Sequence, residues 1–113
     1  MKGIQLRLYT CENRRHGGLP TYEWLLEQAR KQGIPGGSAF RAIAGFGRHG
    51  RLHEQAFFEL AGEEPVVIEF IAGDEQAERF LQLLHAELPD LFVVRVPVEY
   101  GHAGDGSEVA GQG

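Results

Sequence analysis

A short string of glycine, phenylalanine and arginine, Gly45-Phe46-Gly47-Arg48, is the most distinctive chemistry-bearing motif in the chain. Glycines at alternate positions leave backbone N–H groups accessible to a ligand. An arginine adds a fixed fork of donors that fits the oxygens of a phosphate. Nearby residues supply further positive charge or donors. The pattern therefore predicts an anion-binding site that comprises Arg41, Gly45, Phe46, Gly47, Arg48, His49 and Arg51.

The distribution of charge favours the same stretch. Residues 28–53 contain no Asp or Glu but five Lys or Arg residues, so they carry +5. Because the whole chain carries -5, the remainder carries -10. An acidic protein with one basic segment is typical of local anion binding rather than of general nucleic-acid binding. Part of this charge has a simpler interpretation, since Arg30 and Lys31 also suit the C-terminal end of a helix.

Other candidates for chemistry are few. Cys11 is the single cysteine, which excludes an internal disulfide, and no local motif places a base beside it for nucleophilic catalysis. His49 and His53 are four residues apart and would need a third ligand from elsewhere to bind a metal. Glu63 and Glu64 are interpreted as the solvated tip of a hairpin. We therefore expect no catalytic residue, no metal site and no required cofactor.

The first part of the chain predicts a strand, a loop and a helix. The two-residue period of a half-buried strand is set by Ile4, Leu6 and Leu8. Residues 12–18 are polar, contain glycines and have no period, which indicates a loop. The helix begins near Pro20 and ends at Gly33. Its apolar stripe consists of Tyr22, Leu25, Leu26 and Ala29.

The rest of the chain predicts three strands, a further extended segment and a second helix. Strands are expected at residues 38–44, 66–71 and 92–98, and an extra extended segment at 55–60. Pro97 cannot donate to a strand ladder, which places it at an edge or a bulge. The second helix follows Gly73 and ends before Pro89. Its apolar stripe consists of Ala77, Phe80, Leu81, Leu84 and Leu88.

This order predicts an α+β sandwich of the ferredoxin-like βαββαβ kind, in which two helices cover one face of an antiparallel sheet. The domain is expected to span residues 1–100, and residues 101–113 to form a flexible glycine-rich tail. The chain of 113 residues has room for one small core. The uncovered face must meet solvent or another subunit, and its candidate residues, depending on register, are Tyr9, Phe40, Phe57, Val67 or Val93.

Several motifs in order resemble a known family. Gly45-Phe46-Gly47-Arg48 at a strand end, followed by Val67-Ile68-Glu69-Phe70 and Asp74, resembles the PII signalling proteins. The match is closer to the PII-like family called domain of unknown function 190. The residues that carry it are Leu6-Arg7-Leu8-Tyr9, Pro20, Tyr22, Gly33, Gly36, Gly37, Phe40-Arg41, Gly45-Phe46-Gly47 and Pro65-Val66-Val67-Ile68-Glu69.

The resemblance implies a homotrimer with ligand clefts between neighbouring subunits. In PII proteins these clefts bind adenine nucleotides, and a loop, here residues 48–57, contacts a transporter or another protein target. PII proteins also carry a glycine-rich, lysine-containing phosphate loop, whereas this chain has residues 85–91 there. The resemblance thus implies a non-enzymatic sensor or adaptor that binds a smaller adenine nucleotide or another anionic metabolite.

Two other functions are compatible with the sequence. One is a trimeric divalent-metal-tolerance protein of the same fold with histidine ligands, and the other is a small enzyme acting on a phosphorylated metabolite. No apolar run approaches the roughly 20 residues that a membrane-spanning helix needs. The first residues also lack the charged and apolar regions of a signal peptide. We therefore expect a cytoplasmic protein that neither inserts into membranes nor binds nucleic acid.

Overall fold

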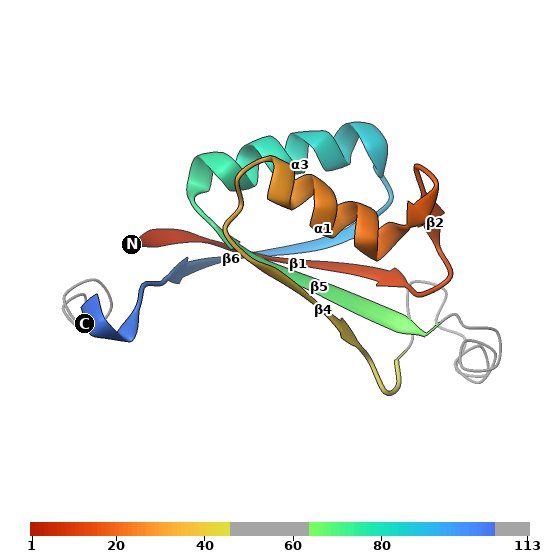
Figure 1. Cartoon of the computed structure of the whole chain (residues 1–113), viewed down its shortest axis with the longest axis horizontal. Helices are drawn as coiled ribbons and strands as arrows, with labels where there is room; N and C mark the ends of the chain where they lie inside the picture. The colour runs from red at the N-terminus through yellow and green to blue at the C-terminus, as the bar shows by residue number, and fades with distance from the viewer. Residues whose placement is uncertain (46–63, 106–113) are drawn as a thin grey trace.

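A twisted four-stranded antiparallel sheet carries two helices on one face (Figure 1). The structure is a computed structural model and describes residues 1–45 and 64–105. Alternating apolar residues form the long strands, and apolar residues at helical spacing form the helices. The elements are β1 (Lys2–Cys11), β2 (Arg15–His16), β3 (Leu19–Pro20), α1 (Thr21–Lys31), β4 (Gly37–Arg41), β5 (Pro65–Ala72), α3 (Asp74–Glu87), β6 (Phe92–Glu99) and a 3₁₀ turn (Ala103–Asp105).

The strand order of the main sheet is β4-β5-β1-β6, and every neighbouring pair is antiparallel. This is the predicted ferredoxin-like βαββαβ topology. β1 begins and β6 ends at one end of the sheet, whereas β4 ends and β5 begins at the other (Figure 1). β6 is an edge strand, which confirms the position predicted for Pro97. Neither described helix is long and apolar enough to cross a membrane.

The core lies between the helices and the covered face of the sheet. On β1 the alternate residues Ile4, Leu6 and Leu8 are buried, as the two-residue period predicted. Phe70 of β5 and Phe80 of α3 meet edge to face, with ring centroids 5.3 Å apart. Such aromatic pairs add stability beyond the area that they bury. The remaining buried apolar residues are Trp24, Leu25, Ala29, Ile34, Val66, Ile68, Ala72, Ala77, Leu84, Leu88 and Leu91.

One glutamine joins the end of α1 to the start of α3. Gly33 follows α1 with a φ of 84°, the left-handed conformation that glycine adopts without strain. The side chain of Gln76 donates to the carbonyl of Gly33 at 2.9 Å and accepts from the backbone N–H of Gly73 at 3.1 Å. The two helices are therefore connected at this end through backbone groups that helix termini leave unpaired.

Of three predictions about the segments that join or end the strands, two need correction and one concerns residues that the structure does not describe. Residues 12–18, predicted as a loop, include β2, which pairs with β3 in a two-residue ladder. Such a ladder is too short to show a period in sequence, and Gly17 and Gly18 turn it with positive φ. β4 ends at Arg41 rather than at residue 44. The extended segment predicted at 55–60 lies outside the described residues.

The predicted tail is described only over residues 101–105, and these residues are exposed. They include the 3₁₀ turn. The backbone N–H of Asp105 donates to the carbonyl of His102 at 2.9 Å, which closes that turn. Just before it, Tyr100 exchanges two hydrogen bonds with Met1, so the chain is held to the start of β1 up to this point.

The face of the sheet opposite the helices carries an apolar row across all four strands. The register places Phe40, Val67, Tyr9 and Phe92 side by side, and we call these four residues the aromatic row. Phe40 is 51% exposed and Phe92 is 65% exposed. Val93, one of the alternatives for this face, instead pairs with Leu8 and packs against the core. Phe57 lies outside the described residues.

Gly37, the first residue of β4, lies directly against the core. A Cβ added there would be 2.3 Å from the ring of buried Phe70, whereas one added at the neighbouring Gly36 would meet nothing within 4 Å. We expect Gly37→Ala to lower the free energy of unfolding by about 1–3 kcal/mol, because the packed ring must move. Gly36→Ala, the matched control, should be neutral or slightly stabilising. Urea unfolding measures both, and equal values for the two variants would contradict the close approach.

Candidate functional site

The predicted anion-binding residues begin where β4 ends. Arg41 is the last residue of β4, and Gly45 lies four residues beyond it. A Cβ added at Gly45 would lie 3.6 Å from Cγ of Pro65, the first residue of β5. The chain leaving β4 therefore still runs beside β5 at this point. The other five predicted residues, Phe46, Gly47, Arg48, His49 and Arg51, lie outside the described part of the structure.

Backbone hydrogen bonds join three strand ends beside Arg41. The N–H of Ala42 donates to the carbonyl of Pro65 at 2.8 Å, which extends the pairing of β4 with β5 by one residue. The N–H of Glu12 donates to the carbonyl of Glu64, also at 2.8 Å, and extends the pairing of β1 with β5. These bonds fix the positions from which the side chains of Glu12, Arg41 and Glu64 project.

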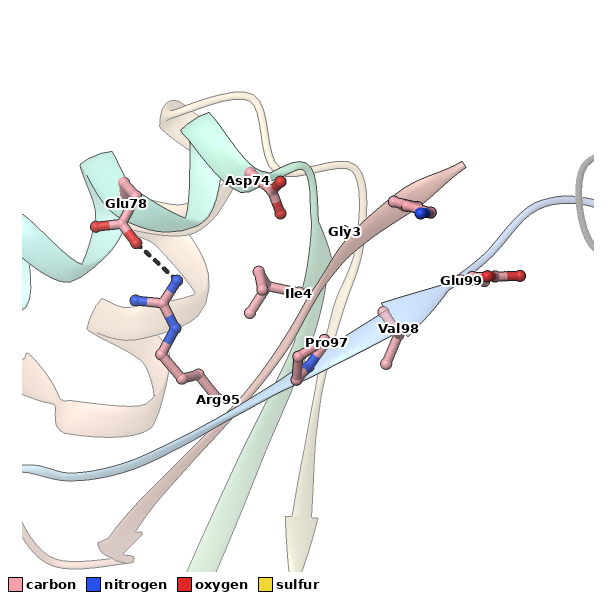
Figure 2. A pocket seen from close by; sticks show the side chains of 9 residues that line it. Gly3, Ile4, Asp74, Glu78, Arg95, Pro97, Val98 and Glu99 are labelled. Carbon is pink, nitrogen blue, oxygen red and sulfur yellow. Dashed lines mark ion pairs between the residues drawn. The ribbon is translucent and has the colours of Figure 1, made fainter. Parts of the chain in front are cut away.

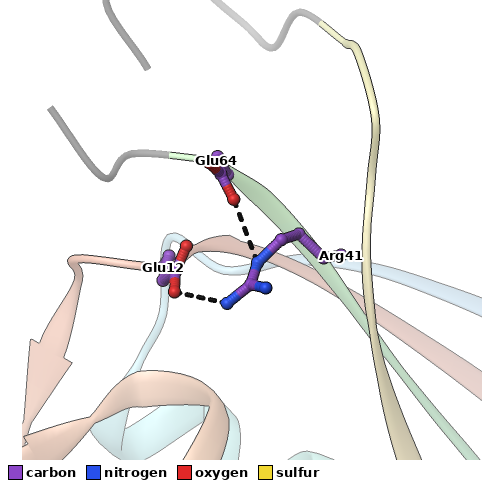
Figure 3. Close-up of polar contacts among 3 residues, drawn as sticks. All are labelled: Glu12, Arg41 and Glu64. Carbon is purple, nitrogen blue, oxygen red and sulfur yellow. Dashed lines mark hydrogen bonds and ion pairs between the residues drawn. The ribbon is translucent and has the colours of Figure 1, made fainter. Parts of the chain in front are cut away.

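The guanidinium of Arg41 lies between two carboxylates (Figure 3). Its Nη2 donates to Oε1 of Glu12 at 2.5 Å, and its Nε lies 3.0 Å from Oε2 of Glu64. Glu12, with Glu64 in support, raises the pKa of Arg41 above its usual value, because both carboxylates favour the charged guanidinium. We call Glu12 and Glu64 the acidic bracket.

The acidic bracket changes what Arg41 offers to an anion. Arginine has five N–H donors, and two of them point to the bracket. The three side chains together carry a formal charge of -1. Neither glutamate was expected at the site from the sequence, because Glu12 falls in a predicted loop and Glu64 in a predicted solvated turn. One feature of the sequence could have indicated a role for Glu64, namely its position directly before the apolar run that forms β5.

The β2–β3 hairpin is held to the far end of α3 by two polar contacts. Nε2 of His16 lies 2.9 Å from Oε1 of Glu87, and Nη2 of Arg14 lies 2.9 Å from Oδ1 of Asp90. The His16 ring also meets the buried ring of Trp24 edge on, with centroids 4.5 Å apart. These contacts fix the hairpin that precedes α1 against the helical layer.

A shallow cavity of about 660 Å³ lies at the opposite end of the sheet, between α3 and β6 (Figure 2). Its walls carry charges of both signs, and Arg95 pairs with Glu78 at 2.6 Å across it. None of the predicted anion-binding residues that the structure describes lines this cavity. The residues around it are Lys2, Gly3, Ile4, Asp74, Glu78, Arg95, Pro97, Val98 and Glu99.

Within residues 1–45 and 64–105, no three His, Cys, Asp or Glu side chains lie together as a metal site would require. The histidines on which the metal alternative depended, His49 and His53, lie outside the described residues. Cys11 is partly buried and its thiol lies 3.4 Å from Oδ1 of Asn13.

Two curated proteins with related sequences carry the description UPF0166 protein. One, from Aquifex aeolicus (strain VF5), is 40% identical over 77 residues, which cover 68% of this chain and 73% of that protein. The other, from Methanocaldococcus jannaschii, is 29% identical over 85 residues, which cover 75% of this chain and 78% of that protein.

Solved structures show the same fold at low sequence identity. CPII from Thiomonas intermedia K12, a structure bound to ADP and bicarbonate, has a TM-score of 0.58 and 16% identity, covering 87% of this chain and 89% of its own. A structure from Thermus thermophilus, described as a PII-like signaling protein, has a TM-score of 0.56 and 18% identity. The match covers 87% of this chain and 86% of that chain. The likeness establishes a PII-like fold for this chain.

The family model described as Uncharacterized ACR matches residues 3–100, which include the helices and nearly all of each strand that the structure describes. The motif residues that suggested this family from sequence and that the structure describes lie on β1, β3, α1, β4 and β5 or in the segments next to them, whereas Phe46 and Gly47 lie outside the described residues. The chain therefore belongs to the DUF190 family.

Proposed function

We propose that this protein is a cytosolic, non-enzymatic PII-like signalling or adaptor protein. In this proposal it binds an adenine nucleotide or a similar anionic metabolite in clefts between copies of itself, and it regulates a partner such as a transporter. The observation that supports the proposal most is the shared fold with CPII, whose structures hold ADP, AMP and bicarbonate. The glycine- and arginine-rich motif that follows β4 supplies the donors that an anion needs.

The link between α3 and β6 favours a small ligand. It comprises residues 88–91, Leu-Pro-Asp-Leu, which include no glycine and no lysine. Loops that cradle several phosphates depend on glycines, which expose successive backbone N–H groups. A nucleotide bound by this chain would therefore receive its phosphate contacts from the motif after β4. This supports AMP or ADP as the ligand rather than ATP.

The uncovered sheet face supports assembly as a homotrimer. The aromatic row presents a continuous apolar surface across the sheet, which a second copy would remove from water. Beside the aromatic row, the same face of the sheet carries polar side chains that already pair with one another within the chain. Glu69 accepts a hydrogen bond from Gln5 at 2.9 Å and lies 3.5 Å from Nε of Arg7. Burial of this face would leave these charges with a partner, which is the condition for burying them at low cost.

Arg48→Ala is expected to weaken the binding of ADP and AMP by about tenfold or more, because a charge-assisted contact to phosphate is lost. Calorimetric titration of the unaltered protein should give dissociation constants in the micromolar range. Arg79→Ala is the matched control, since Arg79 is an exposed arginine of α3 that is not among the predicted anion-binding residues and lies 4.0 Å from Glu75. Failure of AMP, ADP and ATP alike to bind the unaltered protein would overturn the proposed function.

A further inference from the structure

The acidic bracket pairs with Arg41, which the sequence predicted as a second positive charge beside the glycine-rich motif of the anion site. Glu12 and Glu64 come from different strand ends, and backbone hydrogen bonds hold both beside the end of β4. Both carboxylate side chains are 30% exposed, whereas the Arg41 side chain is 60% exposed. An anion that approaches Arg41 from solvent therefore meets a guanidinium whose charge is already balanced by two carboxylates.

The cost of this arrangement depends on the charge of the ligand. Repulsion between an anion and a carboxylate grows in proportion to the charge of the anion. A phosphate group that takes a donor from Arg41 must also compete with the hydrogen bond to Glu12. A nucleotide with one phosphate suffers this repulsion least, and each further phosphate adds to it.

We propose that Glu12 and Glu64 determine the charge preference of the nucleotide site by neutralising Arg41. The inference rests on the proposed function, because it names the specificity determinants of that same site. In the unaltered protein the acidic bracket disfavours ADP and ATP relative to AMP. With the bracket neutralised, Arg41 becomes a free phosphate-binding group and the preference shifts toward the more highly charged nucleotides.

The test compares the dissociation constants of AMP, ADP and ATP for the unaltered protein, E12Q, E64Q and the double variant E12Q/E64Q. Glutamine keeps the size of the side chain and can still accept a hydrogen bond. We expect roughly tenfold tighter binding of ATP by the double variant, a smaller gain for ADP and the smallest for AMP. E75Q is the matched control. Glu75 is 94% exposed on α3 and lies near the end of β5 that is farthest from the bracket.

The same comparison in an R41Q background separates two explanations. If the glutamates act through Arg41, their replacement changes little once Arg41 is absent. If they act only as negative charges, the gain is the same in both backgrounds, and the inference is overturned. Thermal unfolding of each variant shows whether the fold remains stable. If the double variant is unstable, the dissociation constants of E12Q and E64Q measured singly test the inference.

The pattern of binding also distinguishes this inference from the proposed function. Nucleotide binding that is equal in the unaltered protein and E12Q/E64Q overturns the inference and leaves the function standing. Binding by E12Q/E64Q alone supports the inference and overturns the function for the natural chain. Absence of binding by both proteins overturns both.

Discussion

Val67→Asp is expected to separate the assembly into single chains with the 12.5 kDa mass of one subunit, and to abolish nucleotide binding in clefts between subunits. Val67 lies between Phe40 and Tyr9 in the aromatic row, at the centre of the uncovered face. A carboxylate placed there would be buried in the trimer with no positive group opposite it in its own row, which is strongly unfavourable. Because the side chain points away from the helices, the fold of each chain should survive.

Light scattering measures the mass, and calorimetry with ADP measures the binding. Gln82→Asp is the matched control, since it adds the same charge on the exposed outer side of α3 and should leave the mass unchanged. Phe40→Asp on the edge strand β4 is a second variant for the case that Val67→Asp does not fold. A Val67→Asp protein that keeps the mass of three chains would contradict the proposed interface, as would an unaltered protein that has the mass of one.

Phe80→Ala is expected to lower the free energy of unfolding by about 3–5 kcal/mol, which is a large part of the stability of a domain of this size. Phe80 is fully buried and its ring meets Phe70 edge to face, so it connects α3 to the middle of the sheet. Removal of the ring leaves a cavity that the surrounding side chains fill only in part.

Urea unfolding of the unaltered protein and of Phe80→Ala measures the loss. Phe80→Leu, which keeps most of the volume, should cost less than half as much and serves as the control. A loss of under about 1 kcal/mol for Phe80→Ala would show that the helix is held to the sheet by other contacts.

The fold was predictable because its long elements carry complete periods. Leu6 and Leu8 mark the buried side of β1, and Ala77, Phe80 and Leu84 mark the buried stripe of α3; all five are buried. Periodicity assigns residues to faces but does not set the register between strands. Val93 shows the difference, because only its pairing with Leu8 places it on the helix side.

The candidate site was less predictable than the fold. The positions of Arg41 and Gly45 follow from the strand pattern, whereas the contacts of Arg41 depend on residues far away in sequence. Glu12 and Glu64 reach it because β1 and β4 both pair with β5, and this pairing is a property of the sheet as a whole. No local pattern of charge carries that information.

The central position of β1 has a consequence for how the protein is made. β1 precedes the other described strands in sequence and so leaves the ribosome before them, yet its two hydrogen-bonded neighbours, β5 and β6, begin only at residues 65 and 92. One edge of β1 therefore cannot be fully paired until residue 72 has been synthesised, and the other not until residue 99. Pairings over such separations in sequence slow folding, and an unpaired apolar strand is open to pairing with other chains. A chain that ends before β6 would leave one edge of β1 permanently uncovered, so synthesis must reach the last strand before the first is protected.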